Sequence, residues 1–412
     1  MDEHYDALET RDPEQREREQ FAQLGRQLAH AKERSPAFAR SLAGIDPAEI
    51  MSREALARLP VLRKPQLAEL QKEARPFGGL AATRWGAVRR VFASPGPIYE
   101  PEGAASDYWR FARGLYAAGF RAGDLVHNCF SYHFTPAGSM FETAAHALGC
   151  TVFPGGTGQT EQQVAAIADL RPSAYVGTPS FLRIILDRAD ELGVALPSLT
   201  KALVSAEPFP ASLRDAFAAR GIRGFQVYGT ADVGAIAYET SARDGLVVDE
   251  GALVEIVRPG TGDPVAPGEV GEVVVTPLAN VDYPLIRYGT GDLSATLAGA
   301  SACGRTNMRI KGWLGRADQA TKVKGLFVHP AQVAAIVRRH PEVRRARLVV
   351  DNPGGADRMI LHVEVSGVAP ALADSIVESI RDVTKLRGEV TIRAVDELPN
   401  DGKVIDDLRK LE

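Results

Sequence analysis

Short apolar segments alternate with amphipathic segments between about residues 86 and 228 of this 412-residue chain. This alternation predicts an α/β fold, in which a parallel or mixed sheet carries helices on both faces. Ligands of such sheets bind at the carboxyl ends of the strands. The expected strands are 88–93, 124–130, 151–153, 173–177, 202–205 and 224–228, and the expected helices are 107–119, 136–149, 160–170, 180–192 and 211–220.

The regions on either side of this alternation have different patterns. Residues 1–85 predict a helical part, because 14–35 is rich in good helix formers and Asp46 and Ser52 can cap short helices. Segments 252–257 and 269–276, joined by a Gly/Pro-rich turn, predict a β-hairpin. Residues 319–412 predict a small α+β domain with its own core. We therefore expect a large domain, with a helical part (1–85) and a body (86–317), and a small C-terminal domain (318–412).

The overall composition is that of an ordinary globular protein. Hydrophobic residues make up 45% of the chain and charged residues 24%, which excludes a disordered chain. The formal net charge of −4 argues against a nucleic-acid-binding protein, whose affinity depends on clustered Lys and Arg. The N-terminus is charged, so we expect no secretion signal. No apolar run reaches 18 residues, so we expect no membrane span and no membrane partner. Three cysteines fit a reducing compartment, so we expect a cytoplasmic protein.

The segment from Val281 to Leu293 ends in Tyr288-Gly289-Thr290-Gly291-Asp292. An Asp in a Gly-rich turn after a strand can accept two hydrogen bonds from a ribose diol. Alternatively, Asp292 caps the backbone of its own turn. The segment alone does not separate these two interpretations.

A second segment, Tyr228-Gly229-Thr230-Ala231-Asp232, follows an expected strand. The Tyr228 ring can stack on a base, Thr230 can reach a phosphate, and Asp232 can hold Mg²⁺. Alternatively, this is a strand-to-helix loop in which Asp232 is the helix cap.

Two further segments carry charged residues near the C-terminus. Arg316 and Asp318 lie at the expected domain boundary, where a hinge must change its backbone angles, although an ordinary charged linker has the same appearance. Lys403 follows Asn400-Asp401-Gly402 and could swing into a cleft, or it could be a solvated lysine of the tail.

These four segments, in this order and at these separations, resemble the adenylate-forming acyl-CoA synthetase superfamily, and within it the phenylacetate–CoA ligases. The resemblance covers essentially the whole chain. It extends to three short motifs of that family, "TPS", "GAEP" and "CGRT", which match Thr178-Pro179-Ser180, Ser205-Ala206-Glu207-Pro208 and Cys303-Gly304-Arg305-Thr306. The resemblance implies the adenylate-forming fold, with a large N-terminal domain and a mobile C-terminal lid.

The resemblance also implies a two-step reaction that uses ATP, Mg²⁺ and CoA. A small carboxylic acid attacks the α-phosphate of ATP to give acyl-AMP, and the CoA thiol then displaces AMP. Lys403 would contact the carboxylate and the α-phosphate, Asp318 would be the pivot of the lid, and Asp232 would be the magnesium-linked acid. The nucleotide would be bound by Tyr228 at adenine, by Asp292 and Arg316 at ribose, and by Ser205, Ala206, Glu207, Pro208, Gly229 and Thr230 lining the pocket.

The chain departs from the family at the triphosphate end. The family has a Ser/Thr/Gly-rich loop with a Lys, whereas residues 92–101 read Phe-Ala-Ser-Pro-Gly-Pro-Ile-Tyr-Glu-Pro. Pro95 and Pro97 have no N–H to offer a phosphate, and Glu100 stands near the place of the family's Lys. Gly289 replaces a common Arg. Three functions therefore stay open: an acid–CoA ligase with an unusual phosphate grip, a nucleotide or acyl-CoA binding module, or an adenylating enzyme with another acceptor.

The acyl site is expected around the aromatic segment that follows the strand 124–130. Tyr132, Phe134 and Phe141 could line a pocket for an aromatic or small carboxylic acid, and Gly155 and Gly156 would let a flat ring approach the backbone. Alternatively, these aromatic side chains are core residues.

Two other clusters have alternative interpretations. A zinc site would need four converging ligands, but the family buries the helix that carries two of the candidates, so core packing is favoured. The basic stretch around the domain boundary could meet the phosphates of CoA or form a solvated face. The family often forms homodimers, so the resemblance also suggests a homodimer. The zinc candidates are Cys129, His133, His146 and Cys150, and the basic residues are Arg305, Arg309, Lys311, Arg316, Lys322 and Lys324.

Overall fold

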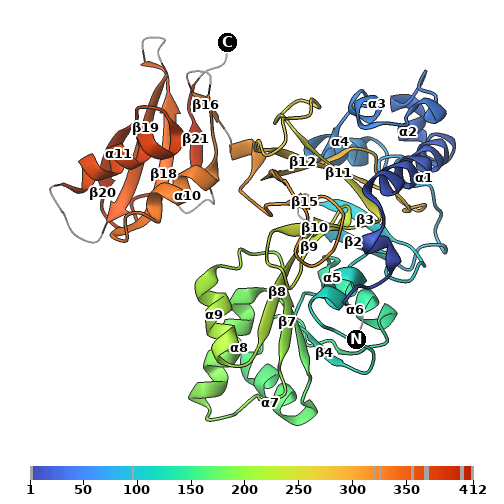
Figure 1. Cartoon of the computed structure of the whole chain (residues 1–412), viewed down its shortest axis with the longest axis horizontal. Helices are drawn as coiled ribbons and strands as arrows, with labels where there is room; N and C mark the ends of the chain where they lie inside the picture. The colour runs from blue at the N-terminus through green and yellow to red at the C-terminus, as the bar shows by residue number, and fades with distance from the viewer. Residues whose placement is uncertain are drawn as a thin grey trace. The chain divides into compact units, whose positions relative to one another are not determined.

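The computed structural model describes residues 3–94, 97–319, 321–323, 326–353, 357–365, 371–399 and 403–409. The chain divides into two compact units (Figure 1), one comprising Met1–Thr290 with Ala295–Gly312 and the other Gly291–Ser294 with Trp313–Glu412. Strand β13 (Tyr288–Ser294) begins in the first unit and ends in the second. Within the described ranges, no helix has both the length and the apolar character that a membrane span requires.

The first unit is built around a nine-stranded mixed sheet with the order β14-β15-β10-β9-β8-β7-β6-β4-β5. The half from β5 to β8 is parallel and the half from β8 to β14 is antiparallel, so the predicted parallel or mixed sheet is confirmed. The strands are β4 (Leu125–Asn128), β5 (Thr151–Phe153), β6 (Ala174–Gly177), β7 (Lys201–Val204), β8 (Arg223–Thr230), β9 (Gly234–Glu239), β10 (Leu246–Val248), β14 (Thr296–Leu297) and β15 (Arg309–Ile310).

Helices cover both faces of the parallel half, as predicted (Figure 1). Successive residues of a strand point to opposite faces. In β7, Leu203 accordingly packs in the core beneath one pair of helices, whereas Ala202 and Val204 pack beneath the other three. The first group is α5 (Ala112–Ala117) and α6 (Ala137–Ala147), and the second is α7 (Thr160–Leu170), α8 (Pro179–Glu191) and α9 (Ala211–Ala219).

The helix predicted over 107–119 is wrong at its start, because α5 begins only at Ala112. The two carboxylate oxygens of Asp107 accept hydrogen bonds from the backbone N–H groups of Phe111 and Ala112, at 2.9 and 3.0 Å. Asp107 and Arg110 both have positive φ, at 48° and 63°. These left-handed residues prevent the helix from extending toward its N-terminus.

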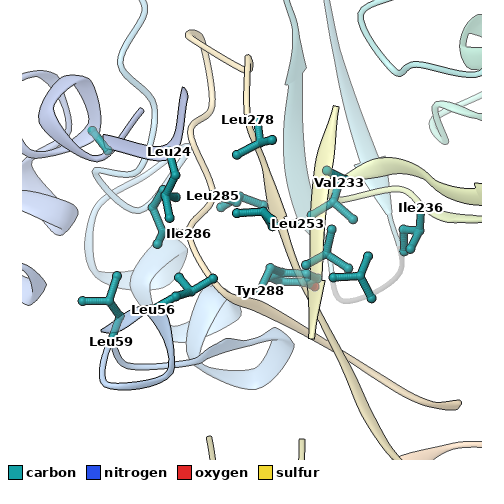
Figure 2. Close-up of a cluster of buried hydrophobic side chains, with 14 of the residues drawn as sticks. Leu24, Leu56, Leu59, Val233, Ile236, Leu253, Leu278, Leu285, Ile286 and Tyr288 are labelled. Atoms are coloured by element: carbon teal, nitrogen blue, oxygen red, sulfur yellow. The ribbon is translucent and has the colours of Figure 1, made fainter. Parts of the chain in front are cut away.

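A helical layer packs on a second sheet, with the order β1-β13-β12-β11. Figure 2 shows the shared core, in which Leu24, Leu56 and Leu59 of the helical part pack near Ile286 and Leu285. The predicted caps are present, since the Asp46 and Ser52 side chains accept hydrogen bonds from the N–H groups of the helical turns that follow them. The helices are α1 (Pro13–Arg34), α2 (Pro36–Ser41), α3 (Arg53–Ala57) and α4 (Lys64–Glu73), and the strands are β1 (Leu62–Arg63) and the predicted hairpin of β11 (Ala252–Val257) and β12 (Gly271–Pro277). A separate hairpin joins β2 (Arg90–Ser94) and β3 (Ile98–Glu102).

The second unit contains a four-stranded sheet with the order β20-β19-β18-β21, which shares one apolar core with two helices. The small α+β architecture predicted for the C-terminal residues is therefore confirmed. Its elements are η3 (Ala317–Gln319), β16 (Thr321–Val323), β17 (Leu326–Val328), α10 (Pro330–Val337), β18 (Val343–Asp351), β19 (Arg358–Val365), α11 (Leu372–Thr384), β20 (Glu389–Arg393) and β21 (Ile405–Asp407).

Candidate active site

Two of the segments expected to bind the nucleotide meet in the first unit. The Tyr228 hydroxyl at the end of β8 donates a hydrogen bond to Oγ1 of Thr290 in β13, over 3.3 Å. Thr290 Oγ1 in turn donates to the Val273 carbonyl oxygen in β12, at 3.0 Å. The fold thus joins two segments that are 62 residues apart in the sequence.

The Ser205–Pro208 segment follows β7, which is the parallel neighbour of β8. The Ser205 hydroxyl donates to the Val227 carbonyl oxygen at 2.8 Å, which ties this segment to β8. Ala206 has a φ of 68°, and Ala206, Glu207 and Pro208 are exposed. These three residues therefore lie at the carboxyl ends of β7 and β8, where ligands of parallel sheets bind.

Asp232 lies in a turn between two antiparallel strands, so the alternative interpretation of it as a helix cap is wrong. The turn is stabilised by Thr230, whose hydroxyl oxygen accepts a hydrogen bond from the Val233 N–H at 3.3 Å. The Asp232 side chain is almost fully buried, and its Oδ1 has no hydrogen-bond partner among the described residues. Its Oδ2 lies 3.6 Å from the Lys64 Nζ.

Glu100 is fully buried in β3, beside Asp232. The Ser94 hydroxyl donates to Glu100 Oε1 at 2.5 Å, and Oε2 has no partner within the described part of the chain. Burial, followed by the charge of Asp232, raises the pKa of Glu100 to about 8. The hairpin that departs from the family pattern therefore places a carboxyl group that is mostly protonated at neutral pH next to Asp232. Pro95 and Gly96 lie outside the described residues.

Asp292 and Arg316 come together in the second unit, as the sequence suggested. Asp292 Oδ1 accepts hydrogen bonds from the Arg316 guanidinium at 3.2 Å and from the Trp313 indole N–H at 3.1 Å. A Cβ on Gly291 would lie 2.6 Å from the Arg316 Nη2, and the φ of 73° at this position also favours glycine. Trp313 was missed by the sequence reasoning, although a large aromatic residue two positions before Gly315 was a visible signal.

The two other C-terminal residues of the predicted site also lie in the second unit. Asp318 is in η3. Lys403 stands just before β21, where its exposed side chain places Nζ 3.5 Å from Asp406 Oδ1. The turn 400–402 that precedes Lys403 lies outside the described residues.

The expected acyl pocket is organised by Asn128, at the end of β4. Its side-chain amide nitrogen donates to the Tyr132 hydroxyl oxygen at 2.8 Å, and its main-chain carbonyl oxygen accepts a hydrogen bond from the Gly156 N–H at 2.9 Å. Phe134 is 80% exposed and has a φ of 62°, while its carbonyl oxygen accepts the Ala93 N–H from β2. Asn128 therefore links Tyr132 and Gly156 at the carboxyl end of β4, whereas Phe134 is attached to β2.

Gln163 fixes the loop that contains Gly155, Gly156 and Gly158, which we call the glycine loop. Its amide nitrogen donates to the carbonyl oxygens of Gly155 and Gly158, at 2.9 and 3.2 Å. Its Oε1 accepts from His127 Nε2 at 2.7 Å, and burial lowers the pKa of His127. A Cβ on Gly155 would lie 2.5 Å from Gln163 Oε1, which explains the glycine.

Phe141 is placed differently from the other predicted pocket residues. It is buried in the core, and its ring stacks on Phe130 with centroids 4.6 Å apart. The structure thus puts Phe141 in the core, whereas Tyr132 is partly exposed and Phe134 is exposed. The core interpretation applies to this aromatic residue.

The zinc and basic-face interpretations receive little support. Among the described residues, no three His, Cys, Asp or Glu side chains converge in a way that could hold a metal ion. Arg305 and Arg309 are buried and pair with Glu9 at 3.1 Å and Asp244 at 2.8 Å, so their expected place on a basic face is wrong. Lys324 lies outside the described residues.

Comparisons with known proteins agree with this arrangement. The model of the family described as "AMP-binding enzyme" matches residues 104–277. A phenylacetate–coenzyme A ligase of Thermus thermophilus is 34% identical over 94% of this chain and 92% of that protein. Another from Aromatoleum evansii is 32% identical over 84% of this chain and 81% of that protein. A crystal structure of an open 2-hydroxyisobutyryl-CoA ligase, in complex with 2-HIB-AMP and CoA, matches with a TM-score of 0.85 and 24% identity, over 99% of this chain and 97% of that one.

The chain is therefore an AMP-binding enzyme with the adenylate-forming fold. Within that class it belongs to the phenylacetate–CoA ligase family, as its identity to these relatives over nearly its full length shows.

Proposed function

We propose that this protein is an AMP-forming acid–CoA ligase, which activates an aryl or small carboxylic acid with ATP and transfers the acyl group to CoA. The observation that carries the proposal is the buried carboxylate of Asp292, which Arg316 and Trp313 hold through hydrogen bonds. A carboxylate fixed in this way is suited to accept hydrogen bonds from the two ribose hydroxyls. The similarity to named CoA ligases over nearly the whole chain supports the same activity.

In the first step, a carboxylate oxygen of the acid attacks the α-phosphorus of ATP. The bond to the leaving pyrophosphate breaks, and acyl-AMP forms. Tyr228 would pack against adenine, and Lys403 would offset the negative charge that gathers between the carboxylate and the α-phosphate. The remaining nucleotide contacts would come from Arg316 behind Asp292 and from Ser205, Ala206, Glu207, Pro208, Gly229 and Thr230.

In the second step, the thiol sulfur of CoA attacks the acyl carbonyl carbon, the thiol proton is lost to solvent, and the bond to AMP breaks. Residues 318–412 would act as a mobile lid that turns about Asp318 between the two steps. Lys403 is needed for the first step only. This division of labour separates its role from that of Asp292, which would bind AMP throughout.

Asp232 is the residue that would hold Mg²⁺. Its Oδ1 is buried without a hydrogen-bond partner among the described residues, and carboxylate oxygens are preferred magnesium ligands. A bound Mg²⁺ ion would neutralise part of the negative charge of the triphosphate. The acyl group would lie against Tyr132, Phe134, Gly155 and Gly156, with Phe141 in the core.

Pyrophosphate release with a panel of aryl and short aliphatic acids, with and without CoA, tests the proposal. We expect acid-dependent release and CoA-dependent turnover to a thioester. A second candidate function, a nucleotide or acyl-CoA binding module, is favoured by the buried Glu100 in the β2–β3 hairpin. This second function predicts no acid-dependent release of pyrophosphate at saturating ATP. Release without a response to CoA would indicate another acyl acceptor.

Two further properties belong to the same proposal. All three cysteines are free thiols, which fits a reducing cytoplasmic compartment. The family resemblance suggests a homodimer, which light scattering during size-exclusion chromatography would detect.

A further inference from the structure

The β2–β3 hairpin, where the triphosphate of ATP is expected, has no basic residue in its turn. The sequence from Ser94 to Glu100 contains neither Lys nor Arg. Arg90, which precedes the turn, donates to Glu102 Oε1 at 2.6 Å and to the Ser139 hydroxyl oxygen at 3.2 Å. A ligand with several negative charges therefore needs a cation from another part of the fold.

Lys64 supplies a cation near Asp232 and near Glu100 of the β2–β3 hairpin. Its Nζ lies 3.6 Å from Asp232 Oδ2, and its charge also acts on Glu100. The side chain remains 34% exposed, so the ammonium group has access to solvent and to a ligand. An ammonium group of this kind binds phosphate oxygens as a compact point charge.

The backbone around Lys64 is fixed by the sheet. Leu62 and Arg63 form β1, which pairs in parallel with Tyr288 and Gly289 of β13. Lys64 is the next residue and begins α4. Its position beside the nucleotide segments is therefore set by main-chain pairing rather than by a flexible loop.

The polar groups near Lys64 are not fully satisfied. Asp232 Oδ1, Glu100 Oε2 and the Tyr288 hydroxyl are all buried, and none has a hydrogen-bond partner among the described residues. Buried polar atoms are rarely left unpaired, and such atoms often mark a place where an ion or ligand binds. The charges of Asp232 and Glu100 both act on the Tyr288 hydroxyl, so the three groups form one buried polar cluster next to Lys64.

We propose that Lys64 is the phosphate-binding lysine of this protein and contacts the β- or γ-phosphate of ATP, in place of a lysine in the hairpin turn. This inference rests on the proposed ATP-dependent function. Asp232 holds the ammonium group near the site, and the exposed part of the side chain lets Nζ turn to a phosphate oxygen. AMP lacks the β- and γ-phosphates, so its binding does not involve Lys64.

The test is to measure the binding of ATP and of AMP by calorimetry, with Mg²⁺ present and without acid or CoA. Replacing a charged hydrogen-bond donor typically weakens binding by about 10- to 100-fold. We expect Lys64→Ala to weaken ATP binding by about that factor, while AMP binding stays within about 2-fold of the unmodified protein. Lys64→Gln keeps most of the aliphatic stem and should show the same selective loss, and Lys64→Arg should recover most of the ATP affinity.

Lys72→Ala is the matched control, since Lys72 lies on the same helix and its exposed side chain pairs with Glu69 at 2.7 Å. This variant should bind both nucleotides normally. Unchanged ATP binding in Lys64→Ala and Lys64→Gln, or an equal loss for ATP and AMP, would overturn the proposal. A protein that binds ATP through Lys64 but releases no pyrophosphate with any acid would contradict the proposed function and leave this inference intact.

Discussion

Replacing Arg287 by Met should destabilise the first unit more than any change of a surface ion pair. Arg287 is completely buried, and its Nε and Nη2 atoms donate to the two carboxylate oxygens of Glu255, both at 2.9 Å. The guanidinium also donates to the carbonyl oxygens of Ala57 at 2.8 Å, Gly262 at 2.8 Å and Leu59. One side chain thus ties the end of α3 to the sheet that contains β13.

The expected loss follows from what the substitution leaves behind. Met fills much of the volume of Arg287, but Glu255 remains buried without a charged partner. Breaking a buried ion pair in this way costs about 3–5 kcal/mol. For a unit of about 300 residues, that loss corresponds to a lowering of its melting temperature by roughly 5–8 °C. The double variant Arg287→Met/Glu255→Leu should regain part of the loss, because it removes the unpaired carboxylate as well.

Differential scanning calorimetry of the full chain measures the melting of this unit. The matched control is Arg183→Met, which removes an exposed pair to Asp187 with a distance of 2.7 Å. Exposed pairs contribute less than about 1 kcal/mol, so the control should melt within about 2 °C of the unmodified protein. If Arg287→Met and Arg183→Met lowered the melting temperature equally, the reasoning about the buried pair would be refuted.

Three further substitutions test the proposed reaction. Lys403→Ala should slow pyrophosphate release about 10²–10³-fold but spare thioester formation from synthetic acyl-AMP, and equal loss in both steps would contradict its role. Asp292→Asn should raise the KM for ATP about 10-fold, and 3′-deoxy-ATP should show a smaller difference between the variant and the unmodified protein if the lost contact is to a ribose hydroxyl. Gln163→Leu should raise the KM for the acid about 10-fold and leave that for ATP unchanged, because Gln163 bonds to Gly155, Gly158 and His127 and to none of the expected nucleotide-binding residues. A parallel rise for both substrates would indicate general loosening.

The secondary structure was predictable wherever the local pattern and the tertiary environment agree. The strand expected over 151–153 coincides with β5, and the helix expected over 14–35 is α1 with a shift of one residue at each end. The start of α5 was missed because Asp107 uses its side chain to cap the backbone in a left-handed conformation. A helical period in the sequence does not reveal such a local competitor.

The candidate site was predictable at its motifs and not at its supporting residues. Asp292 and Arg316 were expected to act together, and they share a hydrogen bond. The supporting roles of Asn128 and Gln163 were not foreseen, because they depend on contacts to main-chain carbonyl and N–H groups of distant loops. Every residue type offers nearly the same main-chain groups, so the sequence does not indicate which of them a side chain will contact.

The positions of charged side chains were the least predictable property, since an arginine can lie at the surface or be buried in an ion pair. Arg305 was expected on a basic face, but it lies inside and pairs with Glu9, nearly three hundred positions away in the sequence. No local pattern around Arg305 indicates that partner. The formal net charge of −4 does not indicate which basic residues are buried and which are exposed.

The two departures from the family at Gly289 and at the hairpin turn have a common structural setting. A Cβ on Gly289 would lie 3.1 Å from the Arg63 Cγ and 2.8 Å from Glu272 Oε1, and Arg63 and Glu272 form an ion pair at 2.9 Å. Arg63 therefore occupies the space that a side chain at position 289 would need, so an arginine there is excluded while this pair is intact. Lys64, the next residue, extends toward Asp232. Because β1 fixes both basic residues against β13, positive charge at this edge of the sheet comes from the N-terminal part of the chain rather than from position 289 or the hairpin turn.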